Sequence, residues 1–242
     1  MKHPLLSVRN ICLSHSNILS KGFCLDNISF DLLQGDSISI LGNSAAGKTT
    51  LMMALLRLHE MDWGEILFKG KNIYKMSRTD SKEYQRFIQP IFQNYDESLN
   101  PRLKIFRSIL LYANKNRNKQ DQLDKIYYLL DILDLRTECL QKYPHQLSGG
   151  EKQRISIVVA LVANPGIIIL DEPFSSLDVI NQKTLLEVLT KIKFDFGLSY
   201  ILITHKIPLV KYFSDNVYLI ENNEMLKFGS FDEFYKHWES ND

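Results

Sequence analysis

The 242-residue sequence has little cysteine and almost no net charge. Its three cysteines, Cys12, Cys24 and Cys139, lie far apart without a C-x-x-C spacing. This distribution predicts neither a disulfide framework nor a zinc site, and it favours a reducing compartment. Lys and Arg number 29 against 28 Asp and Glu, so no bulk positive charge favours nucleic acid, although a local patch could exist. We therefore expect no nucleic-acid partner.

Long apolar runs are also missing. The longest, residues 155–163 and 167–170, fall well short of the roughly 20 residues that a transmembrane helix needs. The first residues lack the continuous apolar core and the cleavage site of a secretory signal. We therefore expect any membrane role of the chain to be peripheral.

The first part of the chain alternates short apolar and polar segments. Between Leu5 and Phe30 this texture, ending in a period-two run at 28–32, predicts an N-terminal antiparallel β layer. A turn at Gly35-Asp36 precedes a strand predicted at 37–41, which runs into a glycine-rich loop and a helix predicted at 48–58. A second helix is predicted at 78–89, followed by a short strand at 90–93.

The middle of the chain is helical and polar in texture from Asn94 to about Leu147. Residues 121–135 place Leu123, Ile126, Tyr127, Leu130 and Leu133 on one face at helical spacing. Strands predicted at 167–170 and 200–203, with a helix at 179–196 between them, and a hairpin at 216–228 turning near Asn222-Asn223 complete the pattern. The sequence predicts an α/β fold with a mainly parallel sheet and an inserted α-helical subdomain.

The glycine-rich loop reads Gly42-Asn-Ser-Ala-Ala-Gly-Lys-Thr49. It fits the pattern G-x-x-x-x-G-K-[ST], in which backbone N–H groups face a phosphate and the following helix adds its positive end. We expect Lys48 to reach the β- and γ-phosphates and the hydroxyl of Thr49 to bind Mg²⁺. A glycine turn capped by threonine is the alternative. The pattern predicts a nucleotide site without specifying its task.

Two acids, Asp171 and Glu172, end the predicted strand at 167–170. Open α/β sheets bind ligands at the carboxyl ends of their strands. We expect Asp171 to hold Mg²⁺ and Glu172, facing the other way, to polarise an attacking water as a general base. The alternative is a pair of solvated acids. The presence of the phosphate loop in the same chain favours catalysis.

A second glycine-rich segment, Leu147-Ser-Gly-Gly-Glu-Lys-Gln-Arg154, precedes these acids. Ser148 is predicted to cap a helix that begins near Gly149, and the two glycines leave backbone N–H groups open to an anion. With this segment, the chain resembles ATP-binding cassette (ABC) ATPases, members of the P-loop NTPases, over nearly its whole length. The resemblance implies that the segment is a signature loop that completes the ATP site of a partner subunit.

Further positions match that family in order. The resemblance implies that Gln93 touches Mg²⁺ and water, that Asp178 contacts the partner across a dimer, and that His205 is a switch histidine for the γ-phosphate. The implied catalytic residues are Lys48, Glu172 and His205, and the implied metal ligands are Thr49, Gln93 and Asp171. The implied nucleotide contacts are Gly42, Asn43, Ser44, Ala45, Ala46, Gly47, Lys48, Thr49, Thr50, Gln93, Ser148, Gly149, Gly150 and Asp178. ATP and Mg²⁺ are the implied ligands.

The chain departs from the family pattern at three places. Ala45 replaces a glycine, and alanine tolerates positive φ poorly, although the minimal pattern does not require glycine there. Glu151 stands where glutamine is common, and Lys206 where aspartate often follows the switch histidine. None of these changes removes a group that the chemistry needs. The aromatic residue that stacks on adenine stays open between His15 and Phe23.

The run Ser98-Leu-Asn-Pro-Arg102 resembles the dipeptide, oligopeptide and nickel importers of the family, with Asn94-Tyr95 in place of the usual Asp-Pro. In such importers this region lies beside the groove that receives a coupling helix, so residues 95–102 are expected to transmit motion. An ordinary surface loop with Pro101 is the alternative. The chain stops about a dozen residues after Gly229 without a further cysteine, which favours the nickel or metal-chelate branch over long peptide importers.

The resemblance implies an assembly at the cytoplasmic face of the membrane. Its expected members are a second cassette, identical or paralogous, two transmembrane permease subunits and, indirectly, an extracytoplasmic binding protein. We expect the ATPase core to span 1–93 and 153–242 and the helical subdomain 94–152. The alternatives are a soluble ABC ATPase of DNA repair or translation and a regulator without turnover. Only about 100 residues without a heptad repeat separate the two glycine-rich loops, which disfavours the soluble ATPase.

Overall fold

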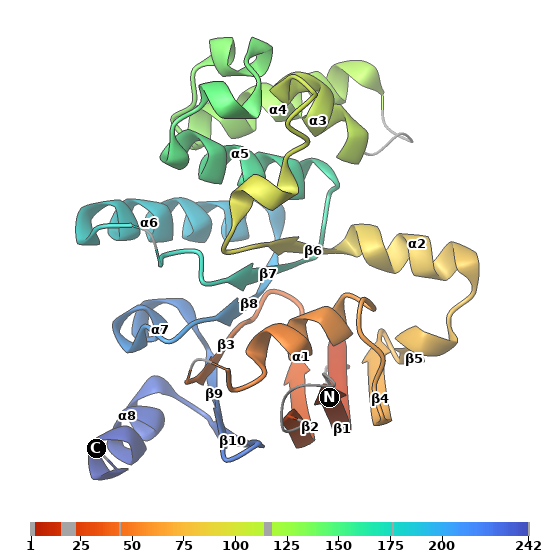
Figure 1. Ribbon diagram of the computed structural model, residues 1–242, viewed down its shortest axis with the longest axis vertical. Coiled ribbons are helices and arrows are strands. Elements are labelled where there is room, and N and C mark those ends of the chain that lie inside the picture. Colours follow the sequence, from red (N-terminus) through yellow and green to blue (C-terminus); the bar gives the residue numbers. More distant parts are fainter. Residues whose placement is uncertain (1–2, 16–22, 44, 114–117, 176, 242) are drawn as a thin grey trace.

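The computed structural model describes residues 3–15, 23–43, 45–113, 118–175 and 177–241. Its strands form a six-stranded and a four-stranded sheet (Figure 1). The six-stranded sheet has the order β10-β9-β3-β8-β7-β6, with β3 at Ser37–Gly42, β6 at Ile88–Ile91, β7 at Ile167–Asp171, β8 at Ser199–Ile203, β9 at Asn216–Glu221 and β10 at Glu224–Phe228. The four-stranded sheet has the order β2-β1-β4-β5, with β1 at Leu6–His15, β2 at Phe23–Leu32, β4 at Trp63–Phe68 and β5 at Lys71–Asn72.

The larger sheet is parallel except for the hairpin of β9 and β10. Its central strands β3, β7 and β8 are buried at every position, because helices or the second sheet cover both faces. Such burial explains why these strands are apolar runs without alternation. The four-stranded sheet is antiparallel, which confirms the predicted N-terminal β layer.

Eight α-helices connect these strands within the described residues: α1 at Lys48–Leu55, α2 at Arg78–Phe87, α3 at Ile105–Tyr112, α4 at Lys119–Ile132, α5 at Gly149–Val162, α6 at Val179–Phe196, α7 at Ile207–Phe213 and α8 at Phe231–Asn241. Short 3₁₀ turns lie at η1 Ile73–Lys75, η2 Tyr95–Ser98, η3 Thr137–Gln141 and η4 Pro144–Gln146. Figure 1 shows α3, α4 and α5 gathered at one end of the molecule and α1 beside β1 and β2. The gathered helices confirm that a helical segment is inserted before β7.

Two apolar cores stabilise the sheet from opposite sides. One lies between the two sheets and includes the buried face of α1, with Leu51, Met52 and Leu55. The other joins the opposite face of the larger sheet to α5, α6 and the helices α3 and α4. Because α5 belongs to the second core over most of its length, the helical segment is fixed to the sheet that carries the acids.

The β1–β4 pairing contains an irregularity that only glycine permits. The register shifts between Arg9 and Cys12, and Gly64 opposite has a φ of 92°. A Cβ on Gly64 would lie 2.6 Å from the carbonyl oxygen of Asn10, closer than non-bonded atoms approach. The glycine therefore allows the two backbones to meet at a bulge.

Several predicted boundaries are wrong by a few residues. The helix predicted at 48–58 ends at Leu55, and the helix predicted at 78–89 ends at Phe87. The strand predicted at 90–93 begins two residues earlier, because Ile88 is buried and pairs with Ile167 of β7. Pro90 is accommodated because β6 is an edge strand, where a missing N–H breaks no ladder. Gln93 therefore lies beyond the strand.

The hairpin at the end of the sheet matches its prediction. Asn222 and Asn223 have φ values of 50° and 70°, which are the left-handed values of a two-residue type I′ turn. Glu224 pairs with Glu221 directly across it. The asparagine pair thus indicated the position of the turn correctly.

The spacing of the cysteines along the chain does not reveal their positions in the fold. All three are free, but the pairing of β1 with β2 brings the Sγ atoms of Cys12 and Cys24 to 3.3 Å. Burial raises the pKa of Cys12 to about 12. The two cysteines are therefore neighbours in the fold, although both are free.

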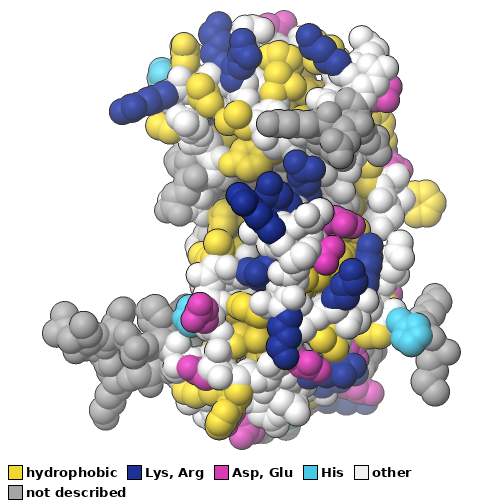
Figure 2. Space-filling model, turned by 90° about the vertical axis from the view of Figure 1, so that its right-hand side faces the viewer, with side chains coloured by type: hydrophobic (Ala, Val, Ile, Leu, Met, Phe, Trp, Pro, Cys, Tyr) yellow, Lys and Arg dark blue, Asp and Glu magenta, His cyan; other side chains and the backbone are white. Residues whose placement is uncertain are grey.

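Charge is distributed unevenly over the surface despite the balanced total. Figure 2 shows Lys and Arg side chains gathered at the middle of the face that includes α2. On that helix Arg78, Lys82 and Arg86 are exposed at intervals of four residues. A local basic patch therefore exists. Within the described residues, none of the helices combines the length and the apolar character that a membrane crossing requires.

Candidate active site

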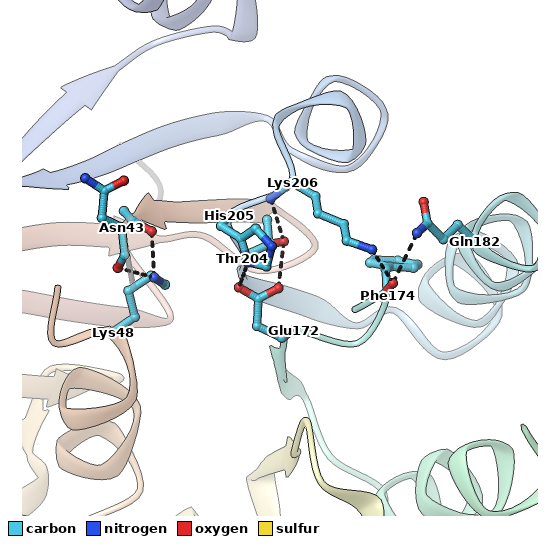
Figure 3. A network of polar contacts seen from close by, with 9 residues as sticks. Asn43, Lys48, Glu172, Phe174, Gln182, Thr204, His205 and Lys206 are labelled. Atoms are coloured by element: carbon cyan, nitrogen blue, oxygen red, sulfur yellow. Dashed lines mark hydrogen bonds and ion pairs between the residues drawn. The ribbon is translucent and has the colours of Figure 1, made fainter. Parts of the chain in front are cut away.

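The phosphate loop leads from β3 into α1. Lys48 is the first residue of α1 and only 9% exposed, and its Nζ donates hydrogen bonds to the carbonyl oxygens of Gly42 at 2.6 Å and Asn43 at 2.8 Å. Gly47, just before the helix, has a φ of 87°. The loop therefore curls around the lysine ammonium, which points back across it (Figure 3).

Most of the remaining loop residues face solvent. Asn43, Ala45 and Thr49 are exposed, and Ala46, Gly47 and Thr50 are half-buried. Ser44 lies outside the described residues. Ala45 adopts a φ of 68°, so this chain does place an alanine in the left-handed region where the sequence analysis noted that glycine is usual. That conformation stores strain of about 1 kcal/mol.

The two acids lie at the end of β7. Asp171 is the last residue of the strand and 8% exposed. Burial and the negative charge of Glu172 raise the pKa of Asp171 to about 6, while Lys48 opposes the rise. Burial lowers the pKa of Lys48, and both acids oppose that change. Lys48, Asp171 and Glu172 therefore interact within one electrostatic centre.

Glu172 leaves the strand in a left-handed turn, with a φ of 48°. Its carboxylate accepts hydrogen bonds from Thr204 Oγ1 at 3.2 Å and from His205 Nδ1 at 2.7 Å (Figure 3). Strand alternation predicted that this side chain would face away from Asp171. The reversed backbone and the two partners on the loop after β8 orient it instead. His205 has a side chain that is 56% exposed, whereas that of Glu172 is 10% exposed.

The signature segment begins α5, with Ser148 as its N-cap. The Oγ of Ser148 accepts from the backbone N–H of Glu151 at 3.2 Å, and the Glu151 carboxylate accepts from the N–H of Ser148 at 2.8 Å. This capping box lowers the pKa of Glu151. The amides of Gly149 and Gly150 bond no described residue, and both glycines are exposed. The cap predicted at Ser148 is confirmed, and an open pair of N–H groups follows it.

Two further predicted residues lie on exposed loops. Gln93 is exposed two residues beyond β6. Asp178 caps α6 by accepting from the backbone N–H of Asn181 at 2.9 Å. The next two side chains, Val179 and Ile180, are apolar and each 80% exposed. Asp178 therefore lies beside an uncovered apolar surface.

The structure thus brings together only part of the predicted set. Lys48, Asp171, Glu172 and His205 form one centre through the interactions described above. Among the described residues, no hydrogen bond or ion pair joins Ser148 to that centre. The side chains of His15 and Phe23 lie outside the described residues. The roles of the individual residues stay predictions.

Sequence reasoning missed the roles of two residues that support the site, Thr204 and Gln153, and it named Tyr95 without expecting its place beside the signature loop. Thr204 is 1% exposed and bonds Glu172. Gln153 of α5 donates from Nε2 to the carbonyl oxygen of Pro173 at 2.5 Å. The Oη of Tyr95 would lie 3.1 Å from a Cβ on Gly149. The first two stand inside quoted motifs, but Thr204 contacts a carboxylate and Gln153 a backbone carbonyl on segments distant in sequence, which no residue pattern reveals.

A chemically suitable set of ligands exists for Mg²⁺. The hydroxyl of Thr49, the amide of Gln93 and the carboxylate of Asp171 offer the hard oxygen atoms that this ion prefers. Burial and, after it, the charge of the neighbouring Glu172 raise the pKa of Asp171, so a bound cation would favour the charged form of this carboxylate. The residues present therefore fit the ion.

Comparisons with known proteins show the family of this chain. The family described as ABC transporter matches residues 25–175. The oligopeptide transport ATP-binding protein OppF of Streptococcus mutans is 37% identical over 98% of this chain and 78% of its own length. OppF of Bacillus subtilis is 35% identical over 88% and 71%. The dipeptide transport ATP-binding protein DppF of Lactococcus lactis is 33% identical over 88% and 70%.

Solved structures share the fold. The structure of cbiO1 from Clostridium perfringens, part of the ABC transporter complex cbiONQ, superposes with a TM-score of 0.82 at 26% identity and covers 98% of this chain and 92% of its own. The dimeric ATP-binding cassette MJ0796, bound to ADP and phosphate, superposes with a TM-score of 0.78 at 22% identity over 92% and 98%. The two-sheet core and the helical segment of this chain are therefore those of ATP-binding cassettes.

Proposed function

Because this chain belongs to the ABC transporter family and is an ATPase of that kind, we propose that it is the nucleotide-binding subunit of a peptide importer. One observation carries the proposal. The chain joins Lys48, Asp171, Glu172 and His205 in one centre, while its signature loop stays exposed and separate from that centre. An ATPase that worked by itself would have no use for a second anion-binding loop.

The residues of the centre suit attack of water on the γ-phosphorus of ATP. The N–H groups of the phosphate loop and Lys48 hold the phosphates, and Thr49, Gln93 and Asp171 hold Mg²⁺, which neutralises phosphate charge when bound. Glu172 takes a proton from the attacking water while the oxygen of that water bonds to the γ-phosphorus and ADP leaves. His205 holds the Glu172 carboxylate through Nδ1, and the imidazolium form of its exposed ring carries a second N–H, at Nε2, that can donate to the γ-phosphate.

The signature loop serves the ATP of a second cassette. Its open N–H groups lie at the positive end of α5, a 14-residue helix, which is a suitable place for phosphate. The exposed Val179 and Ile180 beside Asp178 provide apolar surface for the same partner. Two ATP molecules are then held between the phosphate loop of one subunit and the signature loop of the other.

The cargo class follows from the relatives. The proteins compared above carry the names oligopeptide or dipeptide transport ATP-binding proteins, and residues 98–102 resemble that subfamily. We therefore favour peptides as the cargo. Import of nickel or metal chelates stays a prediction that none of the relatives compared above supports. Two permease subunits and a binding protein complete the proposed importer, with this chain peripheral at the cytoplasmic face of the membrane.

The region from Tyr95 to Arg102 is the proposed contact with a permease subunit. Tyr95 lies in η2, next to Gly149 of the signature loop, and Leu99 is buried in the core that contains α5. A push on this region from a permease would therefore reach α5 directly. This connection is how closure of the cassettes and movement of the permeases would be linked.

Replacement of Glu172 by glutamine tests the proposal. In the chain purified with its transporter subunits, Glu172→Gln should lower kcat for ATP hydrolysis by at least about 100-fold, because the amide cannot accept the proton of water. ATP affinity, measured by equilibrium binding, should change less than twofold. Glu187→Gln, on the exposed face of α6, is the matched control and should leave both values unchanged. Hydrolysis by Glu172→Gln at the normal rate would refute the mechanism.

A further inference from the structure

Lys206 makes a contact that the catalytic scheme does not use. It follows His205 and precedes α7, and it is half-buried. Its Nζ donates a hydrogen bond of 2.7 Å to the backbone carbonyl oxygen of Phe174 (Figure 3). Phe174 lies in the loop that joins β7 to α6, two residues after Glu172. The ammonium therefore bridges two loops that are 32 residues apart in sequence.

The loop between β7 and α6 is held by two further side chains. Gln182 of α6 donates from Nε2 to the carbonyl oxygens of Phe174 at 3.2 Å and Leu177 at 2.8 Å. Gln153 of α5 donates to the carbonyl oxygen of Pro173 at 2.5 Å. The ring of Phe174 is 1% exposed. The middle of the loop is thus fixed from α5, from α6 and, through Lys206, from the loop that carries His205, whose Thr204 and His205 hold only the start of the loop at Glu172.

This loop connects the ATP centre to the surface that is proposed to meet the partner cassette. At its start Glu172 belongs to the ATP centre of the same subunit. At its end Asp178 begins α6 beside the exposed Val179 and Ile180, the surface proposed to meet the partner. A displacement of the His205 loop would reach that surface through the Lys206 bond.

We propose that Lys206 is a positioning residue that ties the switch loop, which carries His205, to the loop between β7 and α6, and so links the ATP centre to the partner-facing surface. This inference rests on the proposed function. A charged donor forms a stronger bond to a carbonyl than a neutral one does. An aspartate, which often follows the switch histidine in the family, has no proton to donate at neutral pH. The link is therefore a property of the lysine in this chain.

The test compares three substitutions at one position. Lys206→Met keeps the aliphatic stem but loses the donor, Lys206→Arg keeps a donor, and Lys206→Asp places a carboxylate near a carbonyl oxygen. Lys211→Met, on an exposed turn of the same α7 helix, is the control for losing a lysine. All variants are measured in the chain purified with its transporter subunits, and circular dichroism checks that each is folded.

Two readouts separate positioning from simple structural damage. Hydrogen exchange is measured at the amides of Ser175 and Leu177, which donate to Glu172 and Phe174. Steady-state kinetics give kcat, KM for ATP and the Hill coefficient. In Lys206→Met we expect exchange to be about tenfold faster, kcat to fall about three- to tenfold and the Hill coefficient to drop toward one, with KM within twofold. Lys206→Arg should restore most of kcat, and Lys206→Asp should be at least as impaired as Lys206→Met.

Two results would overturn the inference. One is a Lys206→Met protein whose exchange, kcat and Hill coefficient match those of the unmodified chain and of Lys211→Met. The other is an equal loss in Lys206→Arg and Lys206→Met, which would show that packing rather than the donated bond matters. Neither result touches the proposed function, which fails if Glu172→Gln still hydrolyses ATP at the normal rate.

Discussion

The two glycine-rich loops of this chain begin helices in very different surroundings. Around the first, Lys48, Asp171 and Glu172 are each less than 10% exposed and interact through hydrogen bonds and charge. Around the second, Ser148, Gly149 and Gly150 are exposed, and the bonds of Ser148 are to its own helix. The first region is assembled from distant segments, whereas the second is complete only as a helix cap.

This difference indicates how the work is divided between subunits. Burial of Asp171, followed by the charge of the neighbouring Glu172, raises the pKa of Asp171, and such a shifted pKa is typical of a catalytic centre. An exposed helix start with open N–H groups contains no such buried acid and can bind an anion. We infer that the chain supplies a catalytic half-site for one ATP and a binding half-site for another. The following predictions test this contrast, from the largest expected effect to the smallest.

Asp171→Asn should separate activity from stability most sharply. Hydrolysis should fall on the order of 100-fold, because the amide is a poor ligand for Mg²⁺. The free energy of unfolding should rise. The pKa of Asp171 near 6 in place of 3.8 means that its charged carboxylate destabilises the folded chain by at most roughly 3 kcal/mol at neutral pH, and asparagine removes this charge. Thermal unfolding in nucleotide-free buffer at pH 7.5 measures the gain. A lower Tm than that of the unmodified chain would contradict this destabilisation.

Ser148→Arg should also lower hydrolysis, but it should lower stability rather than raise it. Its bulk and lost cap should lower hydrolysis by about 10- to 100-fold in the assembled complex, while ATP binding to the chain alone stays within twofold, because Lys48 lies elsewhere. Capping itself contributes about 1 kcal/mol of stability. Ser230→Arg is the matched control, since Ser230 accepts from the N–H of Glu233 at the start of α8 and belongs to neither glycine-rich loop. Weakened ATP binding by the isolated Ser148→Arg chain would break the proposed division.

Ala45→Gly should have the smallest effect. Because Ala45 has a φ of 68°, glycine should stabilise the folded chain by about 1 kcal/mol in chemical denaturation. Ala163→Gly provides the control with the opposite sign, because Ala163 has the right-handed φ of −66° at the end of α5 and should lose stability there. Equal shifts in the two variants would show that the phosphate loop holds no backbone strain.

Much of this molecule could be predicted from its sequence. The strand, loop and helix around Gly42–Thr49 and the strand before Asp171 were recognisable, because apolar runs and glycine positions are local signals. The hairpin turn was equally local, since two asparagines adopt left-handed φ values readily. The exact ends of α1 and α2 could not be recognised in the sequence. For α2, the burial of Ile88 against β7 decides where the helix ends.

The network around Glu172 could not be predicted in the same way. The orientation of Glu172 depends on a left-handed turn and on Thr204, which lies on a neighbouring strand end. The bond of Lys206 to a backbone carbonyl depends on how two loops pack. The closeness of Cys12 to Cys24 depends on strand register. All three result from tertiary contacts between segments distant in sequence.

The most direct test of the account is the ATPase activity per mole of chain as a function of chain concentration, with the oligomeric state measured in parallel by sedimentation. We expect almost no turnover where the chain is monomeric, although Lys48 and Glu172 are intact. Activity should appear only as dimers form or when the partner cassette is added. Constant, robust hydrolysis by a strictly monomeric chain would contradict the division of the two half-sites between subunits.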